Sequence, residues 1–250
     1  PVGRRVRLTP AGRRLADHAV TILAAMEAAR VDLDRSAAPQ GTVRVAAYAT
    51  AVRLLLLPAV GRLAQTHPDL RLQIHEHEPD ECLVLLAADD VDLALTYDYN
   101  LAPATFDRSL ITSPLGEYAW SLAVPAEEAH HVSGPALAVF DRFRSADWIV
   151  NSRNTADADV VRTVASLAGF QPRITHRADS LELLQDMIVA GLGVGLLPTG
   201  QQTVEGVSLL PLRDPGVVLR AYSVARRGRT EWPPLAVVLA QLADGSAPRC

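Results

Sequence analysis

Apolar residues recur at helical spacing near the start of the chain. Thr9 and Pro10 are typical of a helix start, because a Thr hydroxyl caps free N–H groups and Pro fits the first turn. The predicted helix covers residues 10–36 and ends before Pro39. Its apolar positions alternate in steps of four and three residues: Leu15, Ala19, Ile22, Met26, Ala29 and Leu33. This narrow seam favours pairing with another helix, and an amphipathic helix lying on its own domain is the alternative.

From residue 43 onward, short apolar runs alternate with helical patterns. The predicted strands are 43–47, 70–74, 91–96, 118–124, 148–150, 171–176, 194–197 and 217–225. The predicted helices are 51–65, 81–88, 155–168, 180–190 and 232–243. Such alternation is typical of α/β units with a largely parallel sheet, here two similar units in series behind a linker at 37–41.

Composition adds a charge asymmetry to this picture. Of the 250 residues, 49% are hydrophobic, which is enough for more than one folding unit. The net charge of -4 argues against a polyanion-binding surface over the whole chain. Arginines nevertheless crowd the beginning, so one end alone is expected to lie near nucleic acid: Arg4, Arg5 and Arg7.

Cellular location is constrained only by absences in the sequence. Cys82 and Cys250 do not form a disulfide framework, and no apolar stretch approaches the length of a membrane span. The arginines at the start are not followed by the apolar region of a signal peptide. These observations favour a cytoplasmic protein without membrane contact.

Several motifs occur in an order that resembles one protein family. The opening RRVRLTPAGRRLADHAVTIL is similar to the wing and linker helix of LysR-type transcriptional regulators. The block from GTVRVAA through HPDL to VDLALTYDY resembles the first half of their effector-binding domain, and GLGVGLLP resembles a stretch of the second half. The joint order of LTPAG, HPDL, VDLAL and GLGVGLLP is more specific than any one motif.

The resemblance implies a fold and a domain organisation. Residues 1–9 would be the remnant of a winged helix-turn-helix that precedes this chain, and 10–36 would be a dimerisation helix. The rest would be an α/β, two-lobed domain like the type 2 periplasmic binding proteins, with lobe I at 42–118 and 219–250 and lobe II at 119–218. One departure is an apparent extra residue between Arg44 and Pro58, which leaves the register around 48–51 open.

The resemblance also implies a function. A small-molecule effector would bind in the cleft between the lobes and change how a DNA-binding homodimer or homotetramer acts on transcription. Helix N-termini facing the cleft would suit a carboxylate. A solute-binding protein of a transporter could use the same body, but it has no use for a heptad helix behind a basic strand. An enzyme is a further alternative without a catalytic grouping to support it.

Effector contacts in lobe I are expected where strands end. Thr50 lies where the first strand meets a helix, so its hydroxyl is either an effector contact or a plain N-cap. Tyr48 would be a cleft wall or a packed aromatic. Pro79 is a weaker candidate, in a turn at the cleft edge.

Contacts in lobe II are expected in the same position. Asn151 and Ser152 follow a short strand, and polar side chains at such ends mark a crevice, although turn chemistry explains them too. Asp98, between two tyrosines, would line a pocket mouth or hinge, or lie in a solvated turn. Ser180 starts a helix, where capping is favoured over direct binding, and Pro198 is a weaker candidate.

Two motifs suggest sites that the sequence context argues against. The glycines of 191–195 follow a helix and precede a strand, whereas a dinucleotide loop needs the reverse order. They are expected to close the helix and to permit close packing. His75 and His77 share a strand face, but no third metal ligand is evident. No GxSxG, HExxH or Walker pattern occurs, so neither an enzyme, a metal nor a cofactor is expected.

Overall fold

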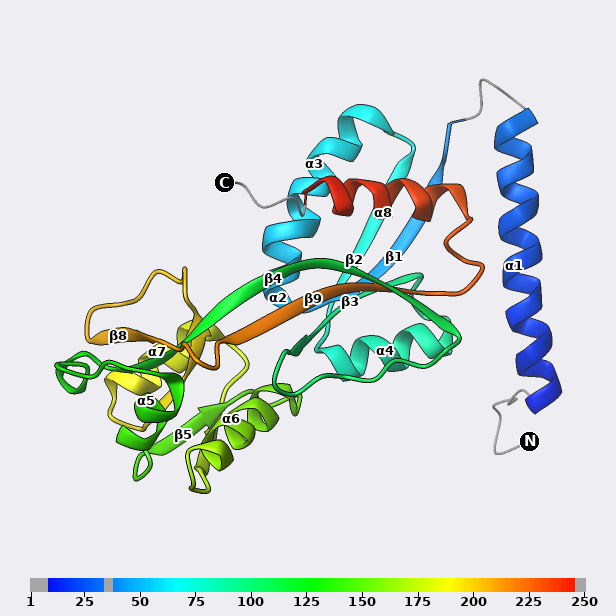
Figure 1. The fold of residues 1–250 in the computed structure, drawn as a ribbon. Coiled ribbons are helices and arrows are strands. Elements are labelled where there is room, and N and C mark those ends of the chain that lie inside the picture. The colour runs from blue at the N-terminus through cyan, green and yellow to red at the C-terminus, as the bar shows by residue number, and fades with distance from the viewer. Residues whose placement is uncertain (1–8, 34–37, 246–250) are drawn as a thin grey trace. The chain divides into compact units, whose positions relative to one another are not determined.

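The computed structural model describes residues 9–33 and 38–245 (Figure 1). Its contacts divide the chain into two compact units. The first comprises Pro1–Thr96, Phe106–Leu115 and Tyr222–Cys250, and the second comprises Tyr97–Thr105 and Gly116–Ala221. The sequence-based division kept 97–105 in the first lobe, whereas the contacts group this segment with the second unit.

The first helix, α1 (Pro10–Leu33), begins where the sequence predicts it. The N–H of Gly12 donates to the Oγ1 of Thr9 at 3.0 Å, so the expected cap is present. The large seam residues stay 59–86% exposed, and these are Leu15, Ile22, Met26 and Leu33. The alternative prediction, a helix that buries its seam against its own domain, is therefore wrong. Arg4, Arg5, Arg7 and the predicted end at Ser36 lie outside the described residues.

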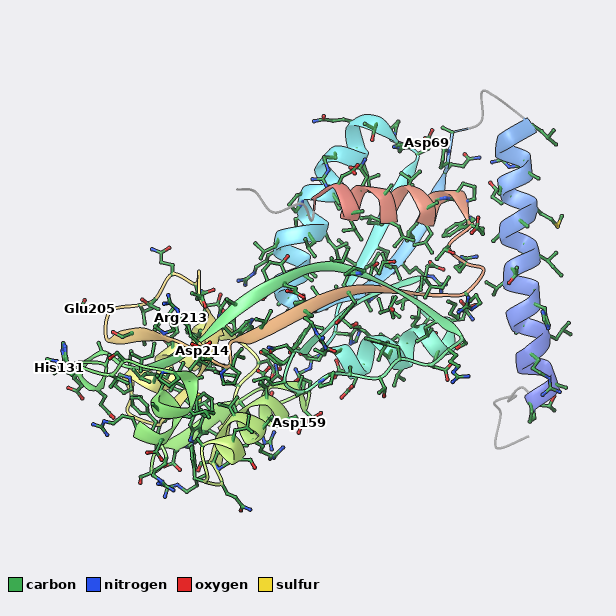
Figure 2. The ribbon with its side chains drawn as sticks, in the orientation of Figure 1. Asp69, His131, Asp159, Glu205, Arg213 and Asp214 are labelled. Atoms are coloured by element: carbon green, nitrogen blue, oxygen red, sulfur yellow. The ribbon has the colours of Figure 1, made fainter. Side chains whose placement is uncertain are left out.

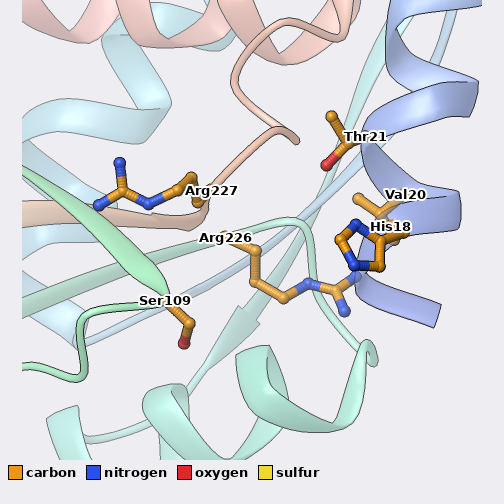
Figure 3. A pocket seen from close by; sticks show the side chains of 6 residues that line it. All are labelled: His18, Val20, Thr21, Ser109, Arg226 and Arg227. Carbon is orange, nitrogen blue, oxygen red and sulfur yellow. The ribbon is translucent and has the colours of Figure 1, made fainter. Parts of the chain in front are cut away.

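The contact of α1 with the first unit uses a different face. Ala24 is fully buried, and Thr21 lies directly against Gly228, where a Cβ would collide with its Oγ1. Figure 3 shows a neighbouring hollow of about 220 Å³, lined from α1 by His18, Val20 and Thr21 and from the opposite wall by Ser109, Arg226 and Arg227. None of these residues belongs to the seam, which leaves the seam available.

The first unit contains a parallel sheet in the order β2-β1-β3. Its strands are β1 (Gly41–Ala47), β2 (Leu70–Glu76) and β3 (Leu93–Tyr99), the last of which continues into the second unit. Helix α4 (Pro79–Ala88) packs Cys82 and Leu86 against Ala46, Ala94 and Val224. The last of these lies on β9 (Val217–Arg226), whose residues up to Ala221 group with the second unit.

The helical segment after β1 contains a π turn. It consists of α2 (Ala49–Ala51), a π turn η1 (Val52–Leu56) and α3 (Leu57–Thr66). In the π turn the N–H of Leu57 donates to the carbonyl of Val52, five residues back. Pro58 lacks an N–H and cannot continue an α-helical ladder, which explains a widened turn just before it. A π turn absorbs one additional residue without rotating the flanking helices, as the apparent insertion requires.

The second unit has a mixed sheet in the order β6-β5-β7-β4-β8. The strands are β4 (Leu110–Pro125, from Gly116 in this unit), β5 (Asp147–Val150), β6 (Arg173–Arg177), β7 (Val194–Pro198) and β8 (Val207–Pro211). β5 is parallel to β6 and β7, whereas β4 is antiparallel to β7 and β8. Helices α6 (Ala156–Leu167) and α7 (Leu181–Val189) follow β5 and β6. Leu184 and Ile188 of α7 pack on Ile149 and Leu197.

The glycines of 191–195 have the structural roles that the sequence favours. Gly191 has a φ of 74° just after α7, the left-handed conformation that ends a helix. A Cβ on Gly193 would lie 2.2 Å from the carbonyl oxygen of Asp147, so only glycine permits this approach of β7 to β5. The expectation of helix closure and close packing is confirmed.

Some elements differ from the sequence prediction. Helix α5 (Ala136–Arg142), strand β8 and the 3₁₀ turn η2 (Ala126–Glu128) were not predicted, and β4 begins eight residues earlier than expected. The final helix α8 (Pro233–Gly245) has the expected Pro-Pro start and packs on α3, where the Nε of Arg62 donates to the Oε1 of Gln241 at 2.8 Å. No helix among the described residues is long and apolar enough to cross a bilayer.

Candidate functional site

The first group of candidate residues lies where β1 gives way to α2. Tyr48 is the N-cap residue, with φ -71° and ψ 153°, and no side chain caps the helix there. The expectation of Thr50 as N-cap is wrong, because Thr50 lies inside the first turn and is half-buried. The first N–H groups of a helix have no partner within it, so this turn presents donors that neither Thr50 nor Tyr48 satisfies by capping.

The electrostatics of this turn favour an anion. The first turn of α2 carries no acidic residue, and Arg53 follows within one turn. Free N–H groups and the helix dipole place positive potential at a helix start, which binds carboxylates and phosphates. Tyr48 is only 7% exposed, so its ring is mostly a packed aromatic.

The turn after β2 satisfies its own donors. Glu78 and Glu81 form a reciprocal capping box at the start of α4, and the N–H of Glu78 donates to Glu81 Oε2 at 3.1 Å. Pro79 is the first residue of α4 and is buried. A role for Pro79 in effector binding therefore stays a prediction that no free polar group supports.

The second group of candidates lies in the loop after β5. The Oδ1 of Asn151 accepts hydrogen bonds from the backbone N–H groups of Arg153, at 2.7 Å, and Asn154, at 3.2 Å. This is the turn chemistry that the sequence offered as the alternative, and it fixes the loop. Ser152 is exposed, and its hydroxyl makes no hydrogen bond within the described part of the chain. A ligand at this loop would therefore contact the hydroxyl of Ser152 and the side-chain amide nitrogen of Asn151.

Asp98 has a surrounding that the sequence did not predict. It lies on β3 and is 2% exposed, so the alternative prediction that Asp98 lies in a solvated turn is wrong. Both carboxylate oxygens accept hydrogen bonds at 2.8 Å from the guanidinium of Arg220, and Oδ2 also accepts from the N–H of Ala104 at 2.9 Å. The pair joins two residues 122 positions apart in sequence, which no local motif reveals.

The remaining candidates of the second unit have local roles. Ser180 caps α7, because its Oγ accepts from the N–H of Leu183 at 3.2 Å and donates to Glu182 at 2.8 Å. Pro198 ends β7 opposite Trp120. The next residue, Thr199, is hydrogen-bonded through its hydroxyl to the buried Ser121 at 2.9 Å. Ser121 and Thr199 are polar groups at this strand end that sequence reasoning missed.

A separate hollow of about 370 Å³ lies at the opposite ends of these strands. Its lining includes Asp147 at the start of β5, Arg173 at the start of β6 and Gly193 beside β7. Hydrogen bonds from Arg173 and then Thr175 hold the pKa of Asp147 below its ordinary value. None of the predicted site residues lines this hollow.

The histidine motif has the geometry expected of one strand face. The rings of His75 and His77 stack with centroids 6.5 Å apart, and His77 Nδ1 lies 3.2 Å from Glu81 Oε2. Among residues 9–33 and 38–245 no three His, Cys, Asp or Glu side chains are grouped to hold a metal. His131 lies apart from this motif, in the loop after η2 (Figure 2).

Comparison with known proteins connects these features to one family. Residues 36–247 match the model of the LysR substrate binding domain. The chain belongs to this family. The expected fold class, an α/β domain of the type 2 periplasmic-binding-protein kind behind a long helix, is confirmed.

Individual relatives are named as regulators. The chain is 26% identical over 213 residues to the HTH-type transcriptional regulator CysB of Haemophilus influenzae, covering 83% of this chain and 63% of that protein. It is 24% identical over 200 residues to the transcriptional dual regulator GltC of Bacillus subtilis, covering 78% of this chain and 64% of that one. The chain thus spans about two thirds of the length of these relatives.

Solved structures agree on the fold. HinK, a LysR family transcriptional regulator from Pseudomonas aeruginosa, superposes with a TM-score of 0.67 at 22% identity. That match covers 95% of this chain and 80% of the other, so it includes α1 as well as both units.

Proposed function

We propose that this chain is the sensing and oligomerising part of a DNA-binding transcriptional regulator of the LysR type, acting in the cytoplasm. The observation that carries the proposal is the family match over residues 36–247. The effector is a small molecule with a carboxylate, and its candidate contacts are Thr50 at a strand end of the first unit and Ser152 at a strand end of the second unit. The acid-free, uncapped start of α2 supports the anionic class of effector.

A ligand screen tests the effector proposal. Small organic acids that bind the folded chain raise its midpoint of thermal unfolding in proportion to their occupancy. We expect at least one acid to raise the midpoint, and we expect Thr50→Ala or Ser152→Ala to reduce that rise. The control is Ser166→Ala, which removes the same hydroxyl from an exposed position on α6. An acid whose effect survives both site variants would contradict this placement.

We further propose that α1 pairs with α1 of a second copy through its seam. The support is the exposure of Leu15, Ile22, Met26 and Leu33, since four large apolar side chains at a/d spacing gain burial only from a partner helix. DNA binding itself is assigned to the longer protein, with Arg4, Arg5 and Arg7 nearest to DNA.

Sedimentation tests the pairing. Ile22→Asp places a charge on the seam and is expected to weaken self-association at least tenfold. The matched control, Leu23→Asp, alters a neighbouring residue of similar exposure, 61% against 59%, that lies off the seam. A parent chain that is monomeric at micromolar concentration would contradict the proposal and favour a solute-binding protein.

A further inference from the structure

The loop that follows β5 is tied to β3 through two tyrosine hydroxyls. The side-chain amide of Asn154 donates to the hydroxyl oxygen of Tyr97 at 2.8 Å. The hydroxyl of Tyr99 donates to Asp157 Oδ1 at 2.9 Å. Asn154 is 6% exposed, Tyr97 7% and Tyr99 0%, so both links are shielded from water at the tyrosine side.

These links are polar groups in a largely apolar setting. The ring of Tyr99 packs edge-on against Tyr97 and against Trp120, with centroids 6.1 and 5.5 Å away. A buried hydroxyl is unfavourable unless it is hydrogen-bonded, and in a low dielectric its bonds are strong and directional. A phenylalanine would fill the same space without this requirement. The hydroxyls therefore hold the loop in one position relative to β3.

The residue between the two tyrosines extends the connection to β9. Asp98 is paired with Arg220 in the bidentate geometry described above. Two positions further along, the side chain of Asn100 donates to the carbonyl of Gly216 and accepts from the N–H of Val218, each at 2.9 Å. The loop after β5 together with the first two residues of α6 is called loop 151–157 below. It forms one hydrogen-bonded cluster with the end of β3 and the start of β9 inside the second unit.

The cluster lies where the chain changes units. It leaves the first unit between Thr96 and Tyr97, and it returns between Ala221 and Tyr222. We propose that Tyr97 and Tyr99 are positioning residues that couple the conformation of loop 151–157 to these two chain crossings. The inference rests on the proposed function, because that function gives the loop its ligand. A ligand that moved Ser152 would then alter the crossings through Asn154 and Asp157.

Hydrogen exchange of the ligand-free protein tests the coupling. Asn154→Ala breaks the loop's link to Tyr97, and Tyr97→Phe breaks it from the other side with the ring retained. In both variants we expect amides 97–100 and 218–222 to exchange about tenfold faster, through local opening. The double variant should exchange no faster than either single one, as is expected for one shared contact.

Two controls separate coupling from a general loss of stability. Amides of β7 should keep their exchange rates, since global destabilisation would accelerate these amides too. Thr155→Ala changes an exposed residue of the same loop whose side chain makes no capping bond, and it should change nothing at the crossings. Faster exchange confined to 151–157 would overturn the proposal. No added acid is needed, so a failed ligand screen would count against the proposed function alone.

Discussion

The two units place polar groups at the ends of their strands in different ways. In the first unit, α2 begins without a side-chain cap and without an acid in its first turn. In the second unit, the backbone N–H groups of the loop after β5 donate to Asn151 and Asn154. The first turn of α6 carries Asp157 and Asp159, of which Figure 2 labels Asp159. One strand end is an uncapped helix start without an acid, and the other is a turn whose backbone donors bond to Asn151 and Asn154 and which lies beside the guanidiniums of Arg153 and Arg177.

The difference assigns different tasks to the two units. An uncapped helix start attracts an anionic group through its backbone and needs no particular side chain. In the turn after β5, the side chains of Asn151 and Asn154 are already hydrogen-bonded to the backbone. This turn can therefore contribute to ligand binding mainly through its fixed shape and the exposed Ser152. In the proposed function, the start of α2 therefore offers backbone donors, whereas the loop after β5 offers the hydroxyl of Ser152.

The units also differ in how they bury a carboxylate. In the first, Asp92 accepts from the N–H and the guanidinium of Arg44 at 2.9–3.1 Å and from Arg229 at 2.8 Å. In the second, Asp98 accepts two hydrogen bonds from the guanidinium of Arg220. Asp92 thus pairs with two guanidiniums, and that of Arg229 also lies over the ring of Trp232 at 4.1 Å from its centroid.

The largest expected effect comes from removing the first of these carboxylates. Asp92→Ala leaves two guanidiniums without their shared partner and should lower the free energy of unfolding by about 3–5 kcal/mol. Asp98→Ala should cost less, about 2–3 kcal/mol, because it leaves the guanidinium of Arg220 without its carboxylate, whereas Asp92→Ala does this to the guanidiniums of both Arg44 and Arg229. Urea unfolding measures both. An equal or larger loss for Asp98→Ala would break the contrast between the units.

Glycine substitutions give the next largest contrast. Gly193→Ala in the second unit forces a Cβ against the backbone of Asp147 and should destabilise by about 3 kcal/mol. Gly61→Ala in α3 of the first unit meets open space and should stabilise by about 0.5–1 kcal/mol, since alanine favours a helix. Thermal unfolding of the two variants checks the opposite signs. A tolerated Gly193→Ala would show that β5 and β7 can separate at this point.

Local patterns allowed much of the fold to be predicted, because the signals there lie within one turn or strand. The Thr9 cap, the closure of α7 at Gly191 and the parallel strands around 43–47 follow from residues close in sequence. Helix α5 was missed because its seven residues are too few to show a period beside the surrounding turn residues. Strand β8 was missed for the same reason.

The candidate site was less predictable, since its partners are distant in sequence. Asn151 and Ser152 were located from a strand end, but Asn154, Asp157 and the tyrosines become a cluster only in the fold. Thr50 was misplaced as a cap because the helix begins at Ala49, two residues earlier than a cap by the Thr50 hydroxyl would require. Side-chain caps decide which strand end keeps unbonded backbone N–H groups, and these caps form only in the folded structure.

Acid should affect the carboxylate of Asp92 in a defined pH range. Burial alone would raise its pKa, but hydrogen bonds from Arg44 and the charge of Arg229 outweigh burial and hold the pKa below the ordinary 3.8. The stabilisation is therefore complete above the unfolded-state pKa of about 3.9 and is lost as pH falls through the lower folded-state pKa. Asp92→Asn should flatten the decline of stability below about pH 4 relative to the parent. An unchanged slope in urea unfolding at pH 3–5 would contradict this.

The smallest expected effects distinguish backbone from side-chain recognition at the two strand ends. Ser152→Ala removes a hydroxyl from a turn with few free groups and should weaken binding of an acid found in the screen about three- to tenfold. Thr50→Ala keeps every N–H group of the first turn of α2 and should weaken binding by less than about threefold. Isothermal titration with Ser166→Ala as control measures both. A larger loss at Thr50 would mean that its hydroxyl, and not the start of α2, holds the carboxylate.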